Sequence, residues 1–493
     1  MIKIPKTMST QHPDNVHSPF FASGSVIGGE DEIKEAFFAF SHLGCEEQLW
    51  DCEGKETDSY VVKKLLTKYD SFFAKKKLGK DLILTLRVPN PSIEKNEAKI
   101  LLETLESIPR SFDVARLFYG EDISPIFEIF LPMTSNAMEL RRIREYYSKI
   151  VVGKKEMKII DNDIKISEWI GDFKPDEIRV TPLIEEKDTI LNADKIVEEY
   201  ITNSNVKDYQ RVWLARSDPA LNFGSLAAIL MNKIALHKLD MLEEKSSIEL
   251  FPILGCGSAP FRGNLSPLNL NCLDGYPSVH TFTVQSAFKY DYENFLVTKA
   301  IEKINSRNKK RAPITNEEVL KKIIEKTSES YRKQIESIAL LINTFSKHIP
   351  QRRKRKLHVG LYGYSRPLKG SISLPRAIGF CATLYSLGIP PELIGLDVLT
   401  RKDISDMEEC YKNFEYDMKS SLKYMNKDNL HIFPLTFQKH IEYVLENLEF
   451  NEDMVDSKHK KITSIIAKDY SDKNFISLEE NIVRAGSIRG FLG

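Results

Sequence analysis

The 493-residue sequence predicts an α/β protein, a (β/α)8 barrel of the TIM type with additional, mostly C-terminal, α-helices. Three observations lead to this prediction. Eight strand-like runs mostly alternate with helical spacing, which is the element order of such a barrel. Charged residues gather just after those strands, where a barrel carries its catalytic groups. Everything after about residue 373 has helical spacing, which is more helix than a barrel requires.

The predicted strands and helices follow one another along the chain. Strands are expected at 45–55, 82–88, 125–131, 177–184, 210–216, 248–254, 279–284 and 358–363. Helices are expected at 30–41, 58–76, 93–108, 137–149, 188–202 and 223–244, and later at 377–387, 403–424 and 435–448. Two irregularities depart from a plain barrel. A loop without a clear helix joins the sixth and seventh strands, and two or more helices separate the seventh from the eighth.

The N-terminal stretch 8–15 has no periodicity and many turn formers. We therefore expect an ordered loop or a floppy terminus there, not a strand or a helix. The whole chain, residues 1–493, should form a single catalytic unit. Its predicted parts are an N-terminal loop and helix carrying His12 (1–44), the barrel (45–372) and a helical C-terminal part packed on the barrel (373–493).

Composition restricts the possible partners and the compartment. Lys plus Arg (70) equals Asp plus Glu (70), so no overall field favours nucleic acid or a membrane. No apolar run approaches the roughly 20 residues of a membrane helix, and the first fifteen residues do not resemble a signal peptide. Six scattered cysteines in such a chain indicate reduced thiols. We therefore predict a cytoplasmic protein.

The segment 177–224 is the part of the sequence densest in chemistry. Two strand-like runs in it end on carboxylates, one at Glu185 and Glu186 and the other at Asp218. The helix between them implies parallel strands, whose ends meet at one edge of the sheet. Two carboxylates there suit a hard divalent cation with water completing its shell. From these residues alone, two surface acids that begin their helices are an equally good interpretation.

Other strand ends add further charged and polar groups. The strand ends or their loops offer Asp51, Glu53, Arg87, Ser135, Glu185, Asp218, Arg262, Gln285 and Arg366. Acids on one rim suit a cation, and arginines suit phosphate or carboxylate as planar bidentate donors. The loops after the last two strands are the usual phosphate site of this fold, so Arg366 and the nearby Arg376 are candidates. The glycine-rich loop 255–264 either supplies amides to an anion or is a plain solvent loop.

A run of basic residues, Arg352 to Lys356, is the most conspicuous charge cluster. It could bind nucleic acid, but it lacks interleaved aromatics and belongs to a chain of zero net charge. We therefore expect a solvated face or a subunit contact.

Several motifs spread over essentially the whole chain resemble those of the archaeal-type, short-form phosphoenolpyruvate carboxylases. The segment Met-Ser-Thr-Gln-His-Pro-Asp-Asn, residues 8–15, is similar to that family's N-terminal signature, and its His12 matches the catalytic histidine of the wider family. The other similar segments are 84–87 with Arg87, 182–185 with Glu185 followed by 192–193, 217–218 with Asp218, 261–263 with Arg262, and 364–367 and 374–377 with Arg366 and Arg376.

The resemblance implies an anaplerotic lyase that fixes carbon dioxide. Phosphoenolpyruvate and bicarbonate would give oxaloacetate and inorganic phosphate through carboxyphosphate and a metal-bound enolate. The resemblance selects Glu185 over Glu186 and implies that Glu185 and Asp218 hold Mg²⁺ or Mn²⁺. The catalytic residues would be His12, Arg87, Arg262 and Arg366. Substrate or phosphate binding would fall to Arg216, Gln285, Arg366 and Arg376.

The sequence departs from the long-form enzymes of the family. Leu221 stands where they carry a lysine, and Arg216 is expected to supply that charge. The glycine-rich loop has fewer glycines and no histidine, so only Arg262 carries over. The chain has about half the long-form length, which puts long-form allosteric sites in doubt. The helices beyond the barrel and the family together predict a homotetramer, a dimer of dimers.

Two other functions fit parts of the same pattern. A different metal-dependent lyase acting on a pyruvate or phosphoenolpyruvate enolate would use the same barrel rim. Nucleic-acid binding through Arg352 to Lys356 is the non-enzymatic alternative. The sequence leaves effectors and the preferred metal undetermined.

Overall fold

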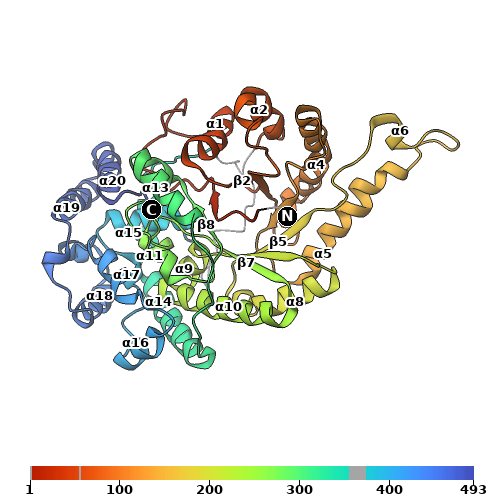
Figure 1. The fold of residues 1–493 in the computed structure, drawn as a ribbon. Helices are drawn as coiled ribbons and strands as arrows, with labels where there is room; N and C mark the ends of the chain where they lie inside the picture. The colour runs from red at the N-terminus through yellow and green to blue at the C-terminus, as the bar shows by residue number, and fades with distance from the viewer. Residues whose placement is uncertain (1–2, 55–56, 355–372) are drawn as a thin grey trace.

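Eight parallel strands close into a barrel in the computed structural model, which describes residues 3–54, 57–354 and 373–493 (Figure 1). Each strand pairs with its neighbours in sequence, and the first strand closes the ring against the last. The strands are β1 (Thr7–Ser9), β2 (Glu47–Asp51), β3 (Ile83–Arg87), β4 (Glu128–Leu131), β5 (Arg179–Ile184), β6 (Tyr209–Leu214), β7 (Glu249–Leu254) and β8 (Thr281–Val284). The predicted (β/α)8 class is confirmed.

The barrel differs from the prediction at its first strand. Seven predicted strands coincide with β2 to β8, but β1 lies in the N-terminal stretch for which we expected no strand. That expectation was wrong because three residues are too few to show a period. The extended conformation of β1 comes from pairing on both sides, since Met8 lies opposite Glu47 of β2 and Thr283 of β8. The strand predicted at 358–363 lies outside the described residues.

Helices surround the ring and connect successive strands. Up to the end of the barrel they are α1 (Glu30–Phe38), α2 (Val61–Lys68), α3 (Asp70–Phe73), α4 (Ala98–Tyr119), α5 (Ala137–Tyr146), α6 (Ile166–Ile170), α7 (Lys187–Leu191), α8 (Ala193–Asn203), α9 (Ser217–Phe223), α10 (Ser225–Ser246), α11 (Asn271–Gly275) and α12 (Ser286–Tyr290). The helix expected at 188–202 is divided at Asn192 into α7 and α8. A short helix, α11, occupies the connection for which no clear helix was expected.

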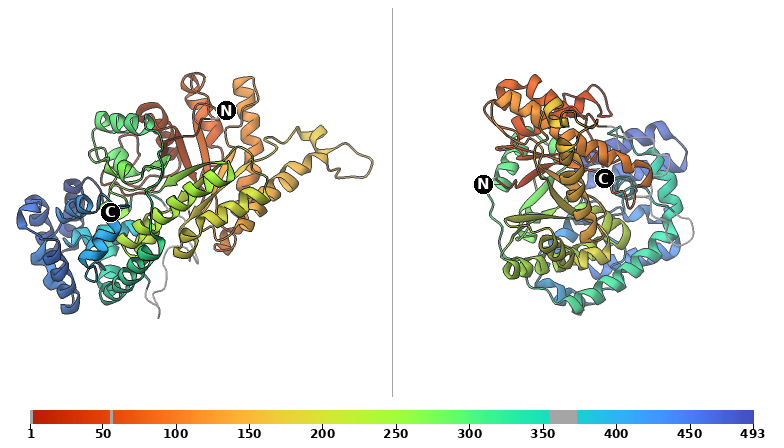
Figure 2. Two further views of the ribbon diagram at one scale, coloured as in Figure 1. Left: turned by 60° about the horizontal axis from the view of Figure 1, so that its bottom comes forward. Right: turned by 90° about the vertical axis from the view of Figure 1, so that its right-hand side faces the viewer.

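The predicted C-terminal helices gather on one side of the barrel (Figure 2). They are α15 (Ala377–Ser386), α16 (Arg401–Glu408), α17 (Phe414–Leu422), α18 (Leu435–Asn447), α19 (Ser457–Ser471) and α20 (Phe475–Arg489). The helices expected after the seventh predicted strand are α13 (Asn294–Asn305) and α14 (Glu317–Phe345). The long helix α14 packs on α10 and α9, and α15 packs on α14, α9 and α20. No helix in the described part of the chain combines the length and apolar character needed to cross a membrane.

Side chains fill the barrel interior in layers. Near the N-terminal ends of the strands, Arg211 of β6 donates to Glu47 of β2 at 2.6 Å and to Glu128 of β4 at 3.1 Å, and all three side chains are buried. Two residues further along the same three strands stand Leu49, Phe130 and Trp213 of a small apolar core. The ionic and apolar layers plug the barrel, so the space for chemistry is at the C-terminal mouth.

A long arm extends from the barrel on the side away from the C-terminal helices (Figures 1 and 2). It comprises residues 153–176, with a short 3₁₀ helix, η4 (Gly153–Glu156), the helix α6 and one antiparallel bridge between Lys158 and Lys165. Its large apolar side chains that are at least half exposed are Met157, Ile159, Ile160, Ile164, Trp169 and Ile170.

The basic run is only partly what the sequence suggested. Arg353 is buried and donates to Glu32 and Glu35 of α1 at 2.9 Å, and Arg352 is also buried. A solvated face was therefore the wrong interpretation at these two positions, because acids on a distant helix neutralise Arg353. Lys354 is exposed, and residues 355 and 356 lie outside the described residues.

Candidate active site

Arg87 ends β3 at the barrel mouth and is bracketed by acids. Its Nε and Nη2 donate to the two carboxylate oxygens of Asp51 at 2.8 Å each, and Nε lies 3.1 Å from Glu53 Oε2. Asp51 ends β2 in register with Arg87, so parallel pairing brings the two side chains together. All three residues are buried. The two acids hold a planar cationic donor fixed at the rim.

Glu185 and Asp218 lie close together, as expected for the ends of two paired parallel strands. Glu185 follows β5, and Asp218 stands in the first turn of α9, just after β6. Burial, and then the charges of Asp218 and Glu53, raise the pKa of Glu185 well above its ordinary value. One hydrogen bond opposes this rise, because the Met133 backbone N–H donates to Glu185 Oε2 at 2.7 Å. Glu185 is buried and Asp218 is half-buried. Like-charged carboxylates crowded together favour a bound cation or a bound proton.

Glu94, in the loop after β3, belongs to the same cluster and was missed from the sequence. Burial, and then the neighbouring Glu53, raise the pKa of Glu94 to about 8. Arg87 and Arg376 act in the opposite direction. The available signal was its place in a loop that follows a strand end, the same rule that selected Arg87.

Arg262, at the end of the 3₁₀ helix η5 (Pro260–Arg262), binds groups from distant parts of the chain. Its Nη2 donates to Gln285 Oε1 at 2.6 Å, its Nη1 to Asp14 at 3.1 Å and to the Gly493 carbonyl at 2.9 Å, and its Nε to Ser217 at 3.1 Å. The structure thus brings together Arg262 and Gln285, which the sequence predicted. Asp14 and Gly493 were missed because the sequence has no local signal for contacts over such separations.

Arg216 does not join the Glu185–Asp218 pair through its described contact. It is buried, and its Nη2 donates to Ser225 of α10 at 3.0 Å. Its Nη1 has no hydrogen-bond partner among the described residues. Its charge acts on Glu392 and Asp417 of the C-terminal part, lowering the pKa of each against the larger effect of burial. The guanidinium therefore faces the side of the barrel on which the C-terminal helices pack.

His12 lies in the loop that follows β1, here called the histidine loop, and hydrogen bonds from residues 10 to 14 hold this loop in place. The loop begins where the Thr10 N–H donates to the Val284 carbonyl at 3.0 Å. The His12 carbonyl accepts from Ser286 N–H at 3.3 Å, and the imidazole Nδ1 lies 2.9 Å from Thr10 Oγ1. The Asp14 carboxylate accepts from Ala287 N–H at 2.7 Å and, with its other oxygen, from Arg262. The histidine loop and the Arg262 cluster are thus one connected structure.

The two arginines predicted to bind phosphate differ in what can be described. Arg376 caps the start of α15 and is half-buried, and its charge acts on Glu94. It therefore belongs with Arg87 at the mouth. Arg366 lies outside the described residues.

The donor set at the mouth fits a small, hard dication. Among the described residues no group of three or more His, Cys, Asp or Glu side chains gathers as a ready-made metal site. Mg²⁺ does not require one, because it usually takes one or two carboxylates and completes its octahedron with water and substrate oxygens. The buried Glu185 with its neighbour Asp218 matches that requirement.

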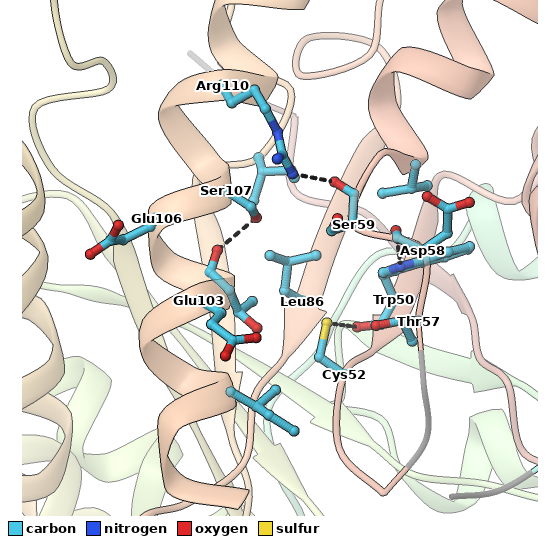
Figure 3. Close-up of a pocket in the computed structure, with 14 residues that line it drawn as sticks. Trp50, Cys52, Thr57, Asp58, Ser59, Leu86, Glu103, Glu106, Ser107 and Arg110 are labelled. Carbon is cyan, nitrogen blue, oxygen red and sulfur yellow. Dashed lines mark hydrogen bonds between the residues drawn. The ribbon is translucent and has the colours of Figure 1, made fainter.

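A separate cavity of about 560 Å³ lies outside the barrel wall, between α2 and α4 (Figure 3). Trp50 lines it and donates to the Asp58 carbonyl at 3.2 Å, and Arg110 donates to the Ser59 carbonyl at 2.9 Å. Successive side chains of a strand point to opposite faces, so Trp50 points away from the barrel interior, which its neighbours Leu49 and Asp51 face. The cavity is therefore separated from the barrel mouth by the strand β2. None of the predicted site residues lines it.

Comparison with known proteins identifies the family of this chain. The family model described as phosphoenolpyruvate carboxylase matches residues 4–493. The chain is 50% identical over 493 residues to a phosphoenolpyruvate carboxylase of Methanothermobacter thermautotrophicus and 49% identical over 493 residues to one of Methanospirillum hungatei, covering 100% of both chains in each case. It is 46% identical over 491 residues to one of Pyrococcus abyssi, covering 99% of this chain and 100% of that relative.

This match spans the barrel, the histidine loop and the C-terminal helices together. It leaves no support for a different lyase or for nucleic-acid binding as the main function, and the burial of Arg353 also argues against the second. The chain belongs to the archaeal-type phosphoenolpyruvate carboxylase family and is an enzyme with phosphoenolpyruvate carboxylase activity.

Proposed function

We propose that the enzyme carboxylates phosphoenolpyruvate at the barrel mouth through carboxyphosphate and an enolate. The observation that carries this proposal is the buried Glu185, which lies close to Asp218 and within the electrostatic influence of the cationic Arg87. Bicarbonate oxygen attacks the phosphorus, the phosphoryl group moves to it, and the enolate of pyruvate leaves. Carboxyphosphate then gives its proton to a base and splits into CO₂ and inorganic phosphate. The enolate carbon attacks CO₂ to form oxaloacetate.

Glu185 and Asp218 would hold Mg²⁺, or Mn²⁺ in its place. When bound, the cation supplies Lewis-acid stabilisation of negative charge on the enolate oxygen and the carboxylate. The two carboxylates would do this from neighbouring strands, with Met133 N–H fixing the orientation of Glu185.

The arginines would neutralise the transferring phosphoryl group. Arg87 and Arg376 act from the acid-rich side of the mouth, and Arg262 acts from the glycine-rich loop with Gln285 beside it. Preorganised donors of this kind usually provide the largest single contribution to catalysis, about 3 to 4 kcal/mol for one donor. We assign Arg366 to the same task from its sequence motif. Arg216, which faces the C-terminal helices, would act on the substrate only at longer range.

His12 would be the general base that takes the proton of carboxyphosphate. Its loop lies directly after β1, between the mouth and α12, and hydrogen bonds fix its backbone on both sides. A base held there can release CO₂ beside the enolate instead of into water.

A coupled assay tests the mechanism. With malate dehydrogenase and NADH present, oxaloacetate formation should require both bicarbonate and Mg²⁺ and should stop on chelation. His12→Asn should retain hydrolysis of phosphoenolpyruvate to pyruvate, while oxaloacetate formation falls by about two orders of magnitude or more. Oxaloacetate formed by that variant at the wild-type rate would remove His12 from the mechanism.

We also propose that the enzyme works as a homotetramer, a dimer of dimers, in the cytoplasm. The exposed apolar side chains of the 153–176 arm support self-association, because one bridge of paired strands cannot hold such a hairpin in water unaided. The arm carries five lysines and six acidic residues, so two copies would meet without strong repulsion. The six cysteines are buried thiols, as suits a reducing compartment.

A further inference from the structure

Four buried charged side chains of the described residues form a cluster that contacts the histidine loop. They are Glu32 and Glu35 of α1, Lys289 of α12 and Arg353 of the basic run. Each of the four residues is at most 3% exposed. Among the described residues, two acids face two bases, so these four charges balance. The proposed reaction uses none of these groups.

Glu35 is the centre of this cluster. Its Oε1 accepts from Lys289 Nζ at 3.0 Å, from the Tyr290 hydroxyl at 2.7 Å and from Arg353 at 2.9 Å. Its Oε2 accepts a second bond from Arg353 at 2.9 Å. These charges keep the Glu35 carboxylate ionised, because they lower its pKa despite complete burial. A buried cluster of this kind is costly to assemble and gains little net stability over apolar packing. Stability alone therefore does not explain why these four charged side chains are buried together.

Lys289 extends the cluster to the histidine loop. Its ammonium donates to Ser9 Oγ at 3.0 Å and to the Thr10 carbonyl at 2.9 Å, as well as to Glu35. All three donor hydrogens of an ammonium are thereby used. Gln11 adds a second connection, since its side chain lies 3.5 Å from Glu35 Oε2 and accepts from the Asp51 N–H at 3.1 Å. Residues 9–11 are thus held between the ionic cluster and the strand ends.

Thr10 transmits this restraint to the imidazole. Its backbone is fixed by Lys289 on the carbonyl side and by the Val284 carbonyl on the N–H side. Its Oγ1 lies 2.9 Å from His12 Nδ1. For Nε2 to accept a proton, Nδ1 must carry the ring hydrogen and donate it to Thr10 Oγ1. The hydroxyl would then set both the ring plane and the tautomer of the base.

We propose that Thr10 is the positioning residue for His12 and that the neutral cluster of Glu32, Glu35, Lys289 and Arg353 holds Thr10 in place. The inference rests on the proposed role of His12 as general base. It also gives a role to Arg353, the buried part of the basic run. Arg353 fixes the Glu35 carboxylate, and that carboxylate in turn fixes Lys289. The expected signature is a changed fate of the enolate: protonation to pyruvate gains over carboxylation to oxaloacetate.

Thr10→Val is the sharpest test, because it removes one oxygen and leaves the charge cluster intact. In Mg²⁺, bicarbonate and phosphoenolpyruvate, we expect the oxaloacetate-to-pyruvate ratio to fall by about tenfold or more while total phosphate release changes less. Thr10→Ser keeps the hydroxyl and should restore the ratio to near the wild-type value. A wild-type ratio in Thr10→Val would overturn the proposal.

Lys289 is tested by a pair of variants that separates charge balance from positioning. Lys289→Met leaves the cluster with an excess acid, and it should lower both the melting temperature and the product ratio. Adding Glu35→Gln restores neutrality, so the melting temperature should recover in the double variant while the ratio stays low. Recovery of both would show that the cluster acts only on stability, and the positioning role would be rejected.

One control variant separates an effect on stability from an effect on the product ratio, and a parallel assay of His12→Asn separates the role of Thr10 from that of His12. Glu128→Gln disturbs a different buried ionic group, near the N-terminal ends of the barrel strands, and should cost stability without changing the product ratio. His12→Asn is assayed alongside. If His12→Asn keeps the wild-type ratio, the proposed general base is wrong. If it collapses the ratio while Thr10→Val does not, only the positioning proposal fails.

Discussion

The surroundings of Glu185 disfavour the charged form of its carboxyl group. Glu185 is 2% exposed, and two further acids, Asp218 and Glu53, act on it. A lone buried carboxylate avoids the cost of its charge by holding a proton. A dication at the pair would make the charged form the favoured one, so metal binding and proton release at Glu185 should be coupled.

Asp218→Asn should weaken metal binding without disturbing the fold. The amide keeps the shape of the side chain but removes one of the two charges that would hold the cation. We expect the Mg²⁺ concentration for half-maximal oxaloacetate formation to rise by about tenfold or more, which corresponds to about 1.4 kcal/mol or more of lost binding. Titration of activity with Mg²⁺ measures this directly.

Glu186→Gln is the matched control. Glu186 is the next residue along the chain from Glu185, but it is half-buried and caps α7. The Glu186→Gln enzyme should need the same Mg²⁺ concentration as the wild type for half-maximal activity. Unchanged metal dependence in Asp218→Asn would transfer the ligand role to Asp51, Glu53 or Glu186.

The site was predictable from the sequence where one rule applied, that chemistry follows the C-terminal ends of barrel strands. That rule places Arg87, Glu185 and Arg262 at the mouth. It does not reveal where a long side chain turns after it leaves the strand, and Arg216 turns toward α10. It also gives no sign of Asp14, which reaches Arg262 only because β1 closes the ring.

At the scale of helices and loops, a buried glutamate with a raised pKa lies where the glycine-rich loop contacts the C-terminal helices. We call this contact the joint. Glu392 lies in the 3₁₀ helix η7 (Pro391–Leu393), is buried, and accepts a hydrogen bond from the Tyr385 hydroxyl of α15. The same hydroxyl accepts from Phe261 N–H in the loop at 3.4 Å. Burial raises the pKa of Glu392 to about 7. The joint therefore holds a proton at a pH where an ordinary glutamate has lost it.

This predicts a pH-dependent stability. The folded protein keeps the Glu392 proton up to about pH 7, whereas the unfolded chain releases it near 4.5, so the free energy of unfolding falls as pH rises between those values. The loss from this group is at most about 3 kcal/mol. Glu392→Gln should match the wild type near pH 5 and exceed it near pH 7.5 in urea unfolding. Parallel curves for the two proteins would contradict the assignment.

Strand prediction succeeded where a strand carries its own pattern. The runs that became β2 to β8 have four to six residues with buried, apolar or alternating side chains. The three residues of β1 do not, and their conformation depends on strands that follow much later in the chain. The predicted helix 188–202 is interrupted at Asn192, where the backbone leaves the helical conformation and the side chain donates to the Asp188 carbonyl.

On the scale of the whole molecule, the arm and the C-terminal helices project from opposite sides of the barrel (Figures 1 and 2). The two parts differ in how they are held. The C-terminal helices bury large apolar side chains against α14 and the barrel, whereas the tip of the arm exposes them. Exposed apolar groups gathered in this way usually mark an interaction surface.

Trp169→Asp should disrupt assembly while preserving each subunit. The side chain is 67% exposed, so its loss should change the melting temperature little, yet a charge would face the partner's apolar groups. Size-exclusion chromatography with light scattering should show a smaller species than the wild-type assembly, which we propose to be a tetramer. Leu435→Asp, at a 72% exposed position on α18, serves as the control and should leave the mass unchanged. An unchanged mass for Trp169→Asp would exclude the arm tip from the contact.

The closure of β1 on β8 also has a consequence for how the enzyme is made. Thr7 leaves the ribosome well before its partner Phe282, which follows after a delay on the order of tens of seconds at cellular rates. Until then β1 can pair only with β2, and Lys289, the anchor of the histidine loop, has not been made. The nascent chain must carry an unpaired strand edge until β8 emerges. Catalytic competence therefore arrives late, and a chaperone that shields that edge should raise the yield of active enzyme.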